Sequence, residues 1–198
     1  MKQFNAELSF PLYLFSALIG TDGCITEIDK GLGFALNFRR IQEYGEDELK
    51  IVIAHEFFHV YQHDLQKNEN QGPRLERGIF AEGWATYASS IISPGYPDWK
   101  YISYSKKDDQ QYKEFQKYQK EIASEFLRLL NSDKYEDYRR FFNADVQYSK
   151  PWPPRSGYFL GYTVAKNLER KMKPKDIALM KYSEFQKILK GELENLAK

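Results

Sequence analysis

Two histidines four residues apart are the side chains of this chain best placed to bind a metal ion. They lie in the segment His55-Glu56-Phe57-Phe58-His59. The run from Asp47 to Gln66 has helical apolar periodicity and no glycine or proline, which predicts a single helix. Residues four apart on a helix share a face, so both imidazoles can point at one ion. Glu56 follows round the helix and lies beside that ion without being needed as a ligand.

This spacing is the H-E-x-x-H pattern of zinc hydrolases, which supplies two metal ligands and a general base. Zinc in such a site makes a water molecule acidic enough to react as hydroxide near neutral pH, and Glu56 would accept the proton. A helix that merely buries two histidines and forms a salt bridge through its glutamate would have the same sequence pattern. The metal hypothesis therefore depends on a third ligand elsewhere in the chain.

His63 continues the four-residue spacing but is predicted not to be that third ligand. A catalytic zinc ion has three protein ligands and one open position. Residues 55 and 63 are separated by about 12 Å along a helix axis, whereas zinc–nitrogen bonds are about 2 Å long. We expect His63 at the rim of the cleft or packed against the next helix.

Glu82 is the better candidate for the third ligand. It is a lone charge in the apolar and small-residue stretch Ala81-Glu82-Gly83-Trp84-Ala85-Thr86-Tyr87. A carboxylate on a buried face must be paired or bind a metal ion. The small residues Gly83 and Ala85 would also let two helices approach each other closely.

Two alternatives compete with this assignment. Glu82 would be a structural residue if it paired with Arg74 or Arg77. Glu76 is a rival ligand, but its position among Arg74, Arg77 and Gly78 predicts a solvated side chain.

These motifs together resemble the gluzincin metallopeptidases, in which the third ligand is a glutamate on the helix after H-E-x-x-H. The pattern Glu82-Gly83-x-Ala85-x-Tyr87 carries this resemblance. With Arg155-Ser156-Gly157-Tyr158-Phe159-Leu160-Gly161-Tyr162, the chain is similar to a family of predicted zinc-dependent proteases, from about Leu8 to Lys171. The resemblance implies zinc ligands at His55, His59 and Glu82, Glu56 as the general base, and peptide hydrolysis.

The resemblance also implies a small sheet whose edge lines the cleft, with residues 32–38 as that edge strand. One position departs from the thermolysin-like pattern. There an aspartate four residues after the third ligand holds a ligand histidine, but this chain has Thr86. The group that orients a histidine must come from elsewhere or be a backbone carbonyl.

A second group of residues follows the proline-rich segment Lys150-Pro151-Trp152-Pro153-Pro154. Arg155, Tyr158 and Tyr162 share one helix face. A tyrosine hydroxyl near the metal would donate to the oxyanion that develops on the scissile carbonyl, a task for which gluzincins use tyrosine or histidine. Tyr158 is the first candidate and Tyr162 the second. Both would be core residues if the stripe of aromatic side chains serves only for packing.

Composition excludes several other classes of protein. The chain has 198 residues, with 29 Lys and Arg against 28 Asp and Glu, which argues against a nucleic-acid partner. A single cysteine, Cys24, excludes an internal disulfide framework and a cysteine-rich structural zinc site. Lys2 and the apolar stretch 10–19 resemble a signal peptide, but Glu7 and Pro11 interrupt the pattern and favour a strand. No stretch is long enough to span a membrane. We expect a soluble, cytoplasmic protein.

The predicted fold is α+β and mostly helical. Strands over residues 8–19, 24–28 and 32–38 are expected to form a small N-terminal antiparallel sheet, the first two joined as a hairpin by a turn at residues 20–23. A zincin-like helical core then follows. The chain is expected to be one domain over residues 1–198, with the sheet at about 8–40, the metal-site helices at about 46–92 and further helices at about 106–196. The expected later helices cover 106–131, 135–142, 155–172 and 173–180, and Ser183 is expected to cap a final one.

The sequence therefore predicts a zinc-dependent peptidase that acts on a peptide or protein substrate. A zinc-dependent hydrolase of a non-peptide amide would carry the same motif, because zinc chemistry on carbonyl groups is general. A non-catalytic binding module on the same fold is the third possibility. Cleavage specificity and oligomeric state leave no trace in the sequence.

Overall fold

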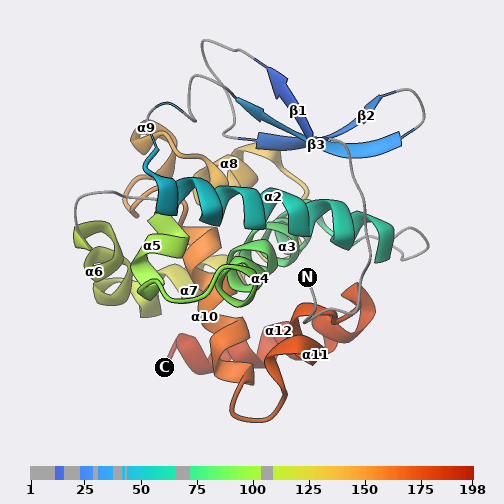
Figure 1. The fold of residues 1–198 in the computed structure, drawn as a ribbon. Coiled ribbons are helices and arrows are strands. Elements are labelled where there is room, and N and C mark those ends of the chain that lie inside the picture. Colours follow the sequence, from blue (N-terminus) through green and yellow to red (C-terminus); the bar gives the residue numbers. More distant parts are fainter. Residues whose placement is uncertain are drawn as a thin grey trace.

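The computed structural model describes residues 12–15, 23–28, 31–37, 42, 44–65, 72–103 and 109–198. Most of these residues are helical, as the sequence predicts. Three strands, β1 (Leu12–Phe15), β2 (Gly23–Ile28) and β3 (Gly31–Asn37), form a sheet that lies over helix α2 (Glu46–Leu65) (Figure 1). Helices α4 (Trp84–Ile92), α10 (Ser156–Leu168), α11 (Pro174–Ala178) and α12 (Tyr182–Leu196) lie on the opposite side of α2 from the sheet.

The sheet is mixed, so the prediction of an antiparallel sheet is wrong for one of its two strand pairs. The strand order is β1-β3-β2, with β2 antiparallel and β1 parallel to β3. Only residues 29 and 30 separate β2 from β3, and so short a connection forces an antiparallel hairpin. The longer connection between β1 and β2 lets the chain pass to the other edge of β3. The predicted hairpin between the first two strands is therefore also wrong, and most of its turn lies outside the described residues.

Strand β3 is central, which corrects a second expectation. Residues 32–38 cannot be an edge strand that lines a cleft, because β3 is paired on both sides. The edges of the sheet are β1 and β2.

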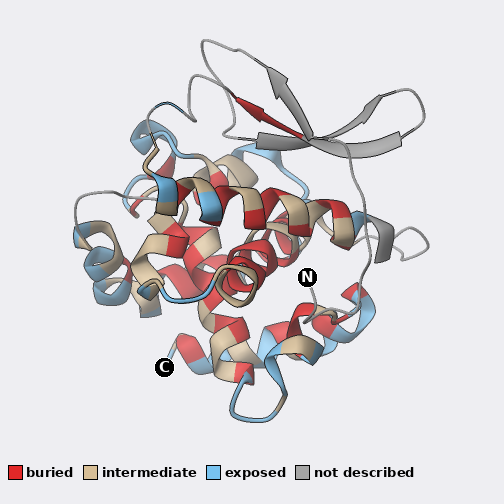
Figure 2. Ribbon diagram, in the orientation of Figure 1, coloured by how far each residue is buried: buried red, intermediate tan, exposed pale blue. Residues whose placement is uncertain are grey.

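Helix α2 confirms the predicted metal-motif helix almost to the residue. It runs from Glu46 to Leu65 and is buried on most of its circumference, because the sheet covers one side and the following helix packs on another (Figure 2). The buried positions are Glu48, Ile51, Val52, Ala54, His55, Glu56, Phe58, Val60 and Gln62. A helix buried on most sides must pair its polar side chains internally, and this one buries Glu48, His55, Glu56 and Gln62, with His59 partly buried beside them.

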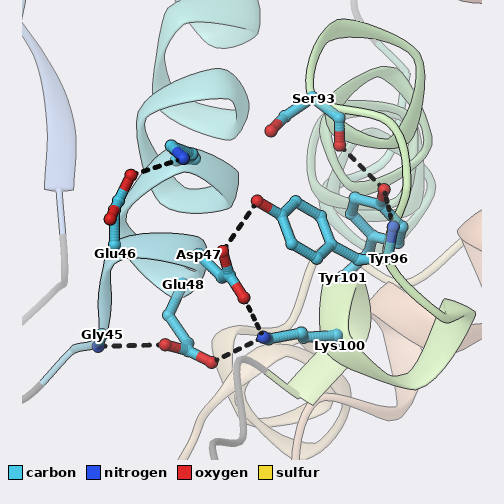
Figure 3. A network of polar contacts seen from close by, with 9 residues as sticks. Gly45, Glu46, Asp47, Glu48, Ser93, Tyr96, Lys100 and Tyr101 are labelled. Atoms are coloured by element: carbon cyan, nitrogen blue, oxygen red, sulfur yellow. Dashed lines mark hydrogen bonds and ion pairs between the residues drawn. The ribbon is translucent and has the colours of Figure 1, made fainter.

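A polar network fixes the first turn of α2 (Figure 3). Lys100 donates to Asp47 at 2.9 Å and lies 3.1 Å from a carboxylate oxygen of Glu48. The Tyr96 hydroxyl also donates to Asp47, at 3.0 Å. Lys100 belongs to α5 (Asp98–Ser103), so the network ties the start of the metal-motif helix to a distant segment. The acidic residues of this turn also complement the helix dipole.

The second of the two helices predicted for the metal site, within residues 46–92, is continuous but contains a π-helical turn. It consists of α3 (Arg74–Gly78), the π-helical segment η2 (Ile79–Gly83) and α4 (Trp84–Ile92). Glu82 lies in the π-helical turn. Such turns insert one residue into an α-helix and occur often at functional sites.

Two glycines bring this helix into backbone contact with α10 (Ser156–Leu168). A Cβ atom on Gly161 would overlap the Cα atom of Gly83 and would lie 2.9 Å from the carbonyl oxygen of Ile79. The predicted close approach of helices at Gly83 is thus present, with Gly161 as its partner. The contact falls at the π-helical turn and places α10 directly against the segment that carries Glu82.

The remaining helices follow the predicted ranges with three differences. The helix expected over 106–131 is two helices, α6 (Gln110–Lys117) and α7 (Gln119–Arg128), which break at Tyr118. The final helix, α12 (Tyr182–Leu196), begins after Lys181 rather than at Ser183. Helices α5 and α9 (Val146–Ser149) were not expected. Helices α8 (Tyr135–Phe142) and α11 (Pro174–Ala178) complete the part of the chain that the structure describes.

The core joins these helices through large aromatic side chains. Trp84 is fully buried, and its indole N–H donates to the Ile177 carbonyl of α11 at 2.8 Å. The Tyr162 hydroxyl donates to Asp98 of α5 at 2.6 Å. Within the described ranges, no helix combines the length and the apolar character needed to cross a membrane.

The glycine contact yields a stability prediction. The Gly161→Ala variant should lower the free energy of unfolding by about 3 kcal/mol, because the added methyl group meets backbone that cannot yield as a side chain would. Gly191→Ala is the matched control, because nothing lies within 4 Å of its Cβ position in α12. That variant should gain up to about 1 kcal/mol from helix propensity. Urea denaturation measures both, and equal stabilities of the two variants would contradict the backbone contact.

Candidate metal centre

The structure brings His55, His59 and Glu82 together as one group of possible metal ligands. The Nε2 atoms of the two histidines are 3.0 Å apart, and the rings meet edge to face. An oxygen of Glu82 lies 3.3 Å from Nε2 of His55 and 3.5 Å from Nε2 of His59. Three donor atoms on two helices thus converge on one point.

These spacings fit the ligand set of a zinc ion. Bonds of about 2.0–2.1 Å at tetrahedral angles separate neighbouring ligand atoms by about 3.3 Å. The three observed separations of 3.0, 3.3 and 3.5 Å lie close to that value. Two imidazoles and a carboxylate are also a donor set that zinc accepts at catalytic sites.

The three candidate ligands differ in how far their side chains are exposed to solvent. The side chain of His55 is 3% exposed, that of His59 12% and that of Glu82 19%. The group therefore lies at the edge of the core, with His55 inside and the other two donors partly in contact with solvent. A fourth ligand from solvent, or a substrate, can approach from the Glu82 and His59 side.

The charges of the three groups are strongly coupled. Burial lowers the pKa of His55 to about 4, which keeps its imidazole neutral at pH 7. Burial opposes the charged form of His59 too, but the Glu82 carboxylate overcomes that effect and raises the pKa of His59. The two histidines in turn hold the pKa of Glu82 well below its ordinary value despite its burial. At pH 7 the group therefore combines a neutral His55 with an ionised Glu82, whose carboxylate favours the charged form of His59.

Glu56 lies next to this group without belonging to it. Its side chain is buried at 7% exposure, and its charge raises the pKa of His59, which places the carboxylate near that ring. His63 is exposed and lies outside the group of possible ligands. The expectation that His63 does not ligate the metal agrees with this placement.

Gln62 lies beside His59 and connects its helix to the segment that carries Glu82. Its side chain helps to raise the pKa of His59, and its amide donates to the Phe80 carbonyl of η2 at 3.0 Å. Gln62 is buried and links both ligand-bearing helices. The signal in the sequence was its place three residues after His59 on the same helix.

Thr86 interacts with the backbone of the third ligand rather than with a histidine. Its hydroxyl donates to the carbonyl oxygen of Glu82 at 2.7 Å. Thr86 is fully buried in α4. The side chain that replaces the expected aspartate therefore stabilises the π-helical turn.

The positions of Glu82 and Glu76 bear on the two alternatives, an ion pair of Glu82 with an arginine and Glu76 as the third ligand. Glu82 lies among the histidines and has no ion pair to Arg74 or Arg77 among the described contacts. The prediction that Glu76 is solvated is wrong. Glu76 is 7% exposed and accepts from the Tyr182 hydroxyl and, at 2.7 Å, from Gln186. It joins α3 to α12 and is remote from the ligand group.

The two candidate tyrosines of α10 occupy different environments. The Tyr158 ring stacks on the His55 ring, with centroids 6.0 Å apart and an interplanar angle of 19°. The Arg155 guanidinium lies 5.4 Å from the Tyr158 centroid. Tyr162 is 2% exposed, and its hydroxyl is committed to Asp98. The structure thus brings Tyr158 to the ligand group and directs Tyr162 away from it.

A further tyrosine, Tyr138 of α8, lies beside Glu82. Its ring edge packs over Gly78, where a Cβ atom would be 2.9 Å away, and Gly78 precedes Glu82 by about one helical turn. Burial and the Glu82 charge both raise the pKa of Tyr138. No sequence signal could have identified it, because α8 reaches the centre only through tertiary packing.

Comparison of the sequence with known protein families gives a match. Residues 6–179 match a protein family described as "Putative zinc dependent peptidase". The chain belongs to this family. The family is described as zinc dependent, and the three residues that could hold the ion are His55, His59 and Glu82. Searches of curated proteins and of solved structures give no match.

The third ligand can be tested by metal affinity. Glu82→Ala removes one of three donors and leaves two imidazoles, so zinc affinity should fall by orders of magnitude. Competition with a chromophoric chelator measures the affinity, and Glu76→Ala controls for loss of a partly buried carboxylate elsewhere. Equal zinc affinity in the wild type and the Glu82→Ala variant would contradict the ligand assignment.

The role of Gln62 gives a second prediction. Gln62→Met keeps the size of the side chain but removes the hydrogen bond to Phe80 and the polar group beside His59, so zinc affinity should fall by about 10- to 100-fold. Gln111→Met is the control, because Gln111 donates to the Pro154 carbonyl at 2.7 Å away from the ligands. The same chelator assay applies. If both variants bound zinc as tightly as the wild type, Gln62 would be only a packing residue.

Proposed function

We propose that this protein is a zinc-dependent peptidase that hydrolyses peptide bonds, with Glu56 as its general base. The observation that supports the proposal best is the triangle of His55, His59 and Glu82 donors, whose sides of 3.0–3.5 Å match one zinc ion. Among the described residues, three protein donors meet in this group, a number typical of catalytic rather than structural zinc sites. The family description points the same way.

The metal ligands and Glu56 divide the chemistry between them. A zinc ion held by the three ligands supplies Lewis-acid activation of water and of the substrate carbonyl group. Glu56 takes the proton from the attacking water and delivers it to the leaving amine. Its position one residue after His55 places the carboxylate beside the centre while its own helix holds it rigidly. Burial of Glu56 near His59 keeps this carboxylate in a region of low dielectric, where proton transfer responds strongly to nearby charges.

Tyr158 is proposed to donate its hydroxyl to the substrate carbonyl oxygen as negative charge develops there. The support is its ring stacked on His55 and its place on α10, which contacts the π-helical turn directly. Arg155 lies over the same ring and adds positive charge to that side of the centre. Tyr162, the second candidate, would have to break its 2.6 Å hydrogen bond to Asp98 to take part. We therefore assign Tyr162 a structural role in this proposal.

The general-base assignment predicts a separation of binding from turnover. Glu56→Gln should keep zinc and lower the rate of peptide hydrolysis by at least about a hundredfold, because the amide cannot accept the proton. Mass spectrometry of a mixed peptide pool, incubated with each zinc-loaded protein, measures turnover. Glu46→Gln in the same helix is the control, since Glu46 is 82% exposed and pairs only with Lys50. Retained hydrolysis in Glu56→Gln would refute the assignment, and a zinc-loaded wild type that cleaves no peptide would refute the peptidase proposal.

A further inference from the structure

Two arginines converge on one exposed tyrosine near the metal centre. The guanidinium carbons of Arg74 and Arg139 lie 5.8 and 5.5 Å from the centroid of the Tyr135 ring. Tyr135 is 53% exposed. Arg139 also lies 3.5 Å from the ring centroid of Tyr148, which is 40% exposed. We call Arg74, Arg139 and Tyr135 the arginine pair site.

Neither guanidinium forms an ion pair within the part of the chain that the structure describes. Arg74 donates from Nε to the carbonyl oxygen of Asp133 at 3.2 Å, and the Asp133 carboxylate accepts from the backbone N–H of Arg74. Arg139 has contacts only with the two aromatic rings.

The neighbouring arginines are different. Arg128 and Arg140 both donate to the carboxylate of Glu125, at 2.8 and 2.7 Å. Two like charges that share one aromatic ring, with no carboxylate between them, repel each other. An incoming anion would relieve that repulsion and use the free N–H groups of both side chains.

The rings hold the guanidinium groups in place for such a ligand. Stacking on aromatic faces leaves the edges of a guanidinium, which carry its N–H donors, directed sideways. Carboxylates bind to those edges with two parallel hydrogen bonds. The site is therefore partly preorganised for a carboxylate before the ligand arrives.

The arginine pair site includes a residue of the same continuous helix that carries Glu82. Arg74, Gly78 and Glu82 follow one another at four-residue intervals along one continuous helix, so Arg74 is about 12 Å from Glu82 along the axis. Tyr138 packs over Gly78 between them. The Tyr138 and Tyr135 rings stack with centroids 6.4 Å apart. A row of contacts thus runs from the helix turn before Glu82, through Tyr138 and Tyr135, to the two arginines.

We propose that the arginine pair site binds a carboxylate of the peptide substrate, three or four residues from the scissile bond. The spacing follows from the distance of about 12 Å, since an extended peptide advances about 3.3 Å per residue. The carboxylate is either an acidic side chain or the C-terminus of the peptide. This assignment rests on the proposed peptidase function and adds a substrate preference to it.

Binding to an inactive protein tests the preference separately from catalysis. The zinc-loaded Glu56→Gln protein is titrated into fluorescein-labelled peptides that differ only by Asp or Asn at successive positions, and by a free or amidated C-terminus. Fluorescence anisotropy gives the dissociation constants. The same titrations are made with Arg74→Gln/Arg139→Gln added, and with Arg170→Gln added as the control. Arg170 is exposed on the turn after α10.

The expected result is that an acidic peptide binds about tenfold more tightly than its neutral partner. The double variant should lose that difference, Arg170→Gln should keep it, and added salt should weaken it. Loss on amidation would identify the C-terminal carboxylate as the ligand, and loss on Asp to Asn exchange an acidic side chain. Equal binding of acidic and neutral peptides, or an unchanged preference in the double variant, would overturn the proposal.

The two proposals fail in different ways. If the wild-type protein cleaves peptides without regard to their acidic residues, the arginine pair site has no role in substrate selection although the peptidase function stands. If acidic peptides bind through the arginines but no peptide is cleaved, the peptidase function fails and the binding site stands.

Discussion

The contact between the Glu82 carboxylate and two imidazoles is the constraint around which this structure is arranged. A carboxylate taken out of water costs several kcal/mol unless partners compensate it. Here the partners are His55 and His59, at 3.3 and 3.5 Å from one oxygen of Glu82. Burial keeps His55 neutral, whereas Glu82 raises the pKa of His59, so the Glu82 carboxylate and the His59 imidazolium stabilise each other in their charged forms.

Holding three donors within 3.5 Å of one another requires two helices in fixed register. Helix α2 is clamped at its start by Lys100 and is covered by the sheet on one side. The second helix is held against α10 by the Gly83–Gly161 backbone contact and widened by a π-helical turn at Glu82. Gln62 crosses between the two helices, from His59 to the Phe80 carbonyl. The Gly83 contact, the π-helical turn and Gln62 lie within a few residues of Glu82 or His59, and the Lys100 contacts hold the start of the helix that carries the histidines.

The convergence of the three candidate ligands was predictable because their geometry is local or chemically exceptional. His55 and His59 lie one turn apart on a helix whose periodicity is evident, and Glu82 is a lone charge in an apolar stretch. The contributions of Tyr138, Arg74 and Arg139 depend on where α8 packs, and helix packing leaves no short-range pattern. The mixed sheet was missed for a similar reason. Alternation of apolar residues predicts strands but does not order them, and the strand that pairs with β3 on its second edge is chosen by the path of the connection. The prediction for Glu76 failed in the other direction. Its charged neighbours in the sequence indicated a solvent-exposed side chain, but Tyr182 and Gln186 of a distant helix bury it and donate hydrogen bonds to it.

X-ray absorption spectroscopy at the zinc edge tests the central assignment most directly. We expect a four-coordinate ion whose nearest neighbours are all nitrogen or oxygen, at about 2.0–2.1 Å, with outer-shell scattering from two imidazole rings. The Glu82→Ala protein should lose the ion or show an altered first shell. Scattering from three imidazoles would mean that His63 joins the site, and scattering from sulfur would mean that Cys24 does. Either result would contradict a centre built from His55, His59 and Glu82.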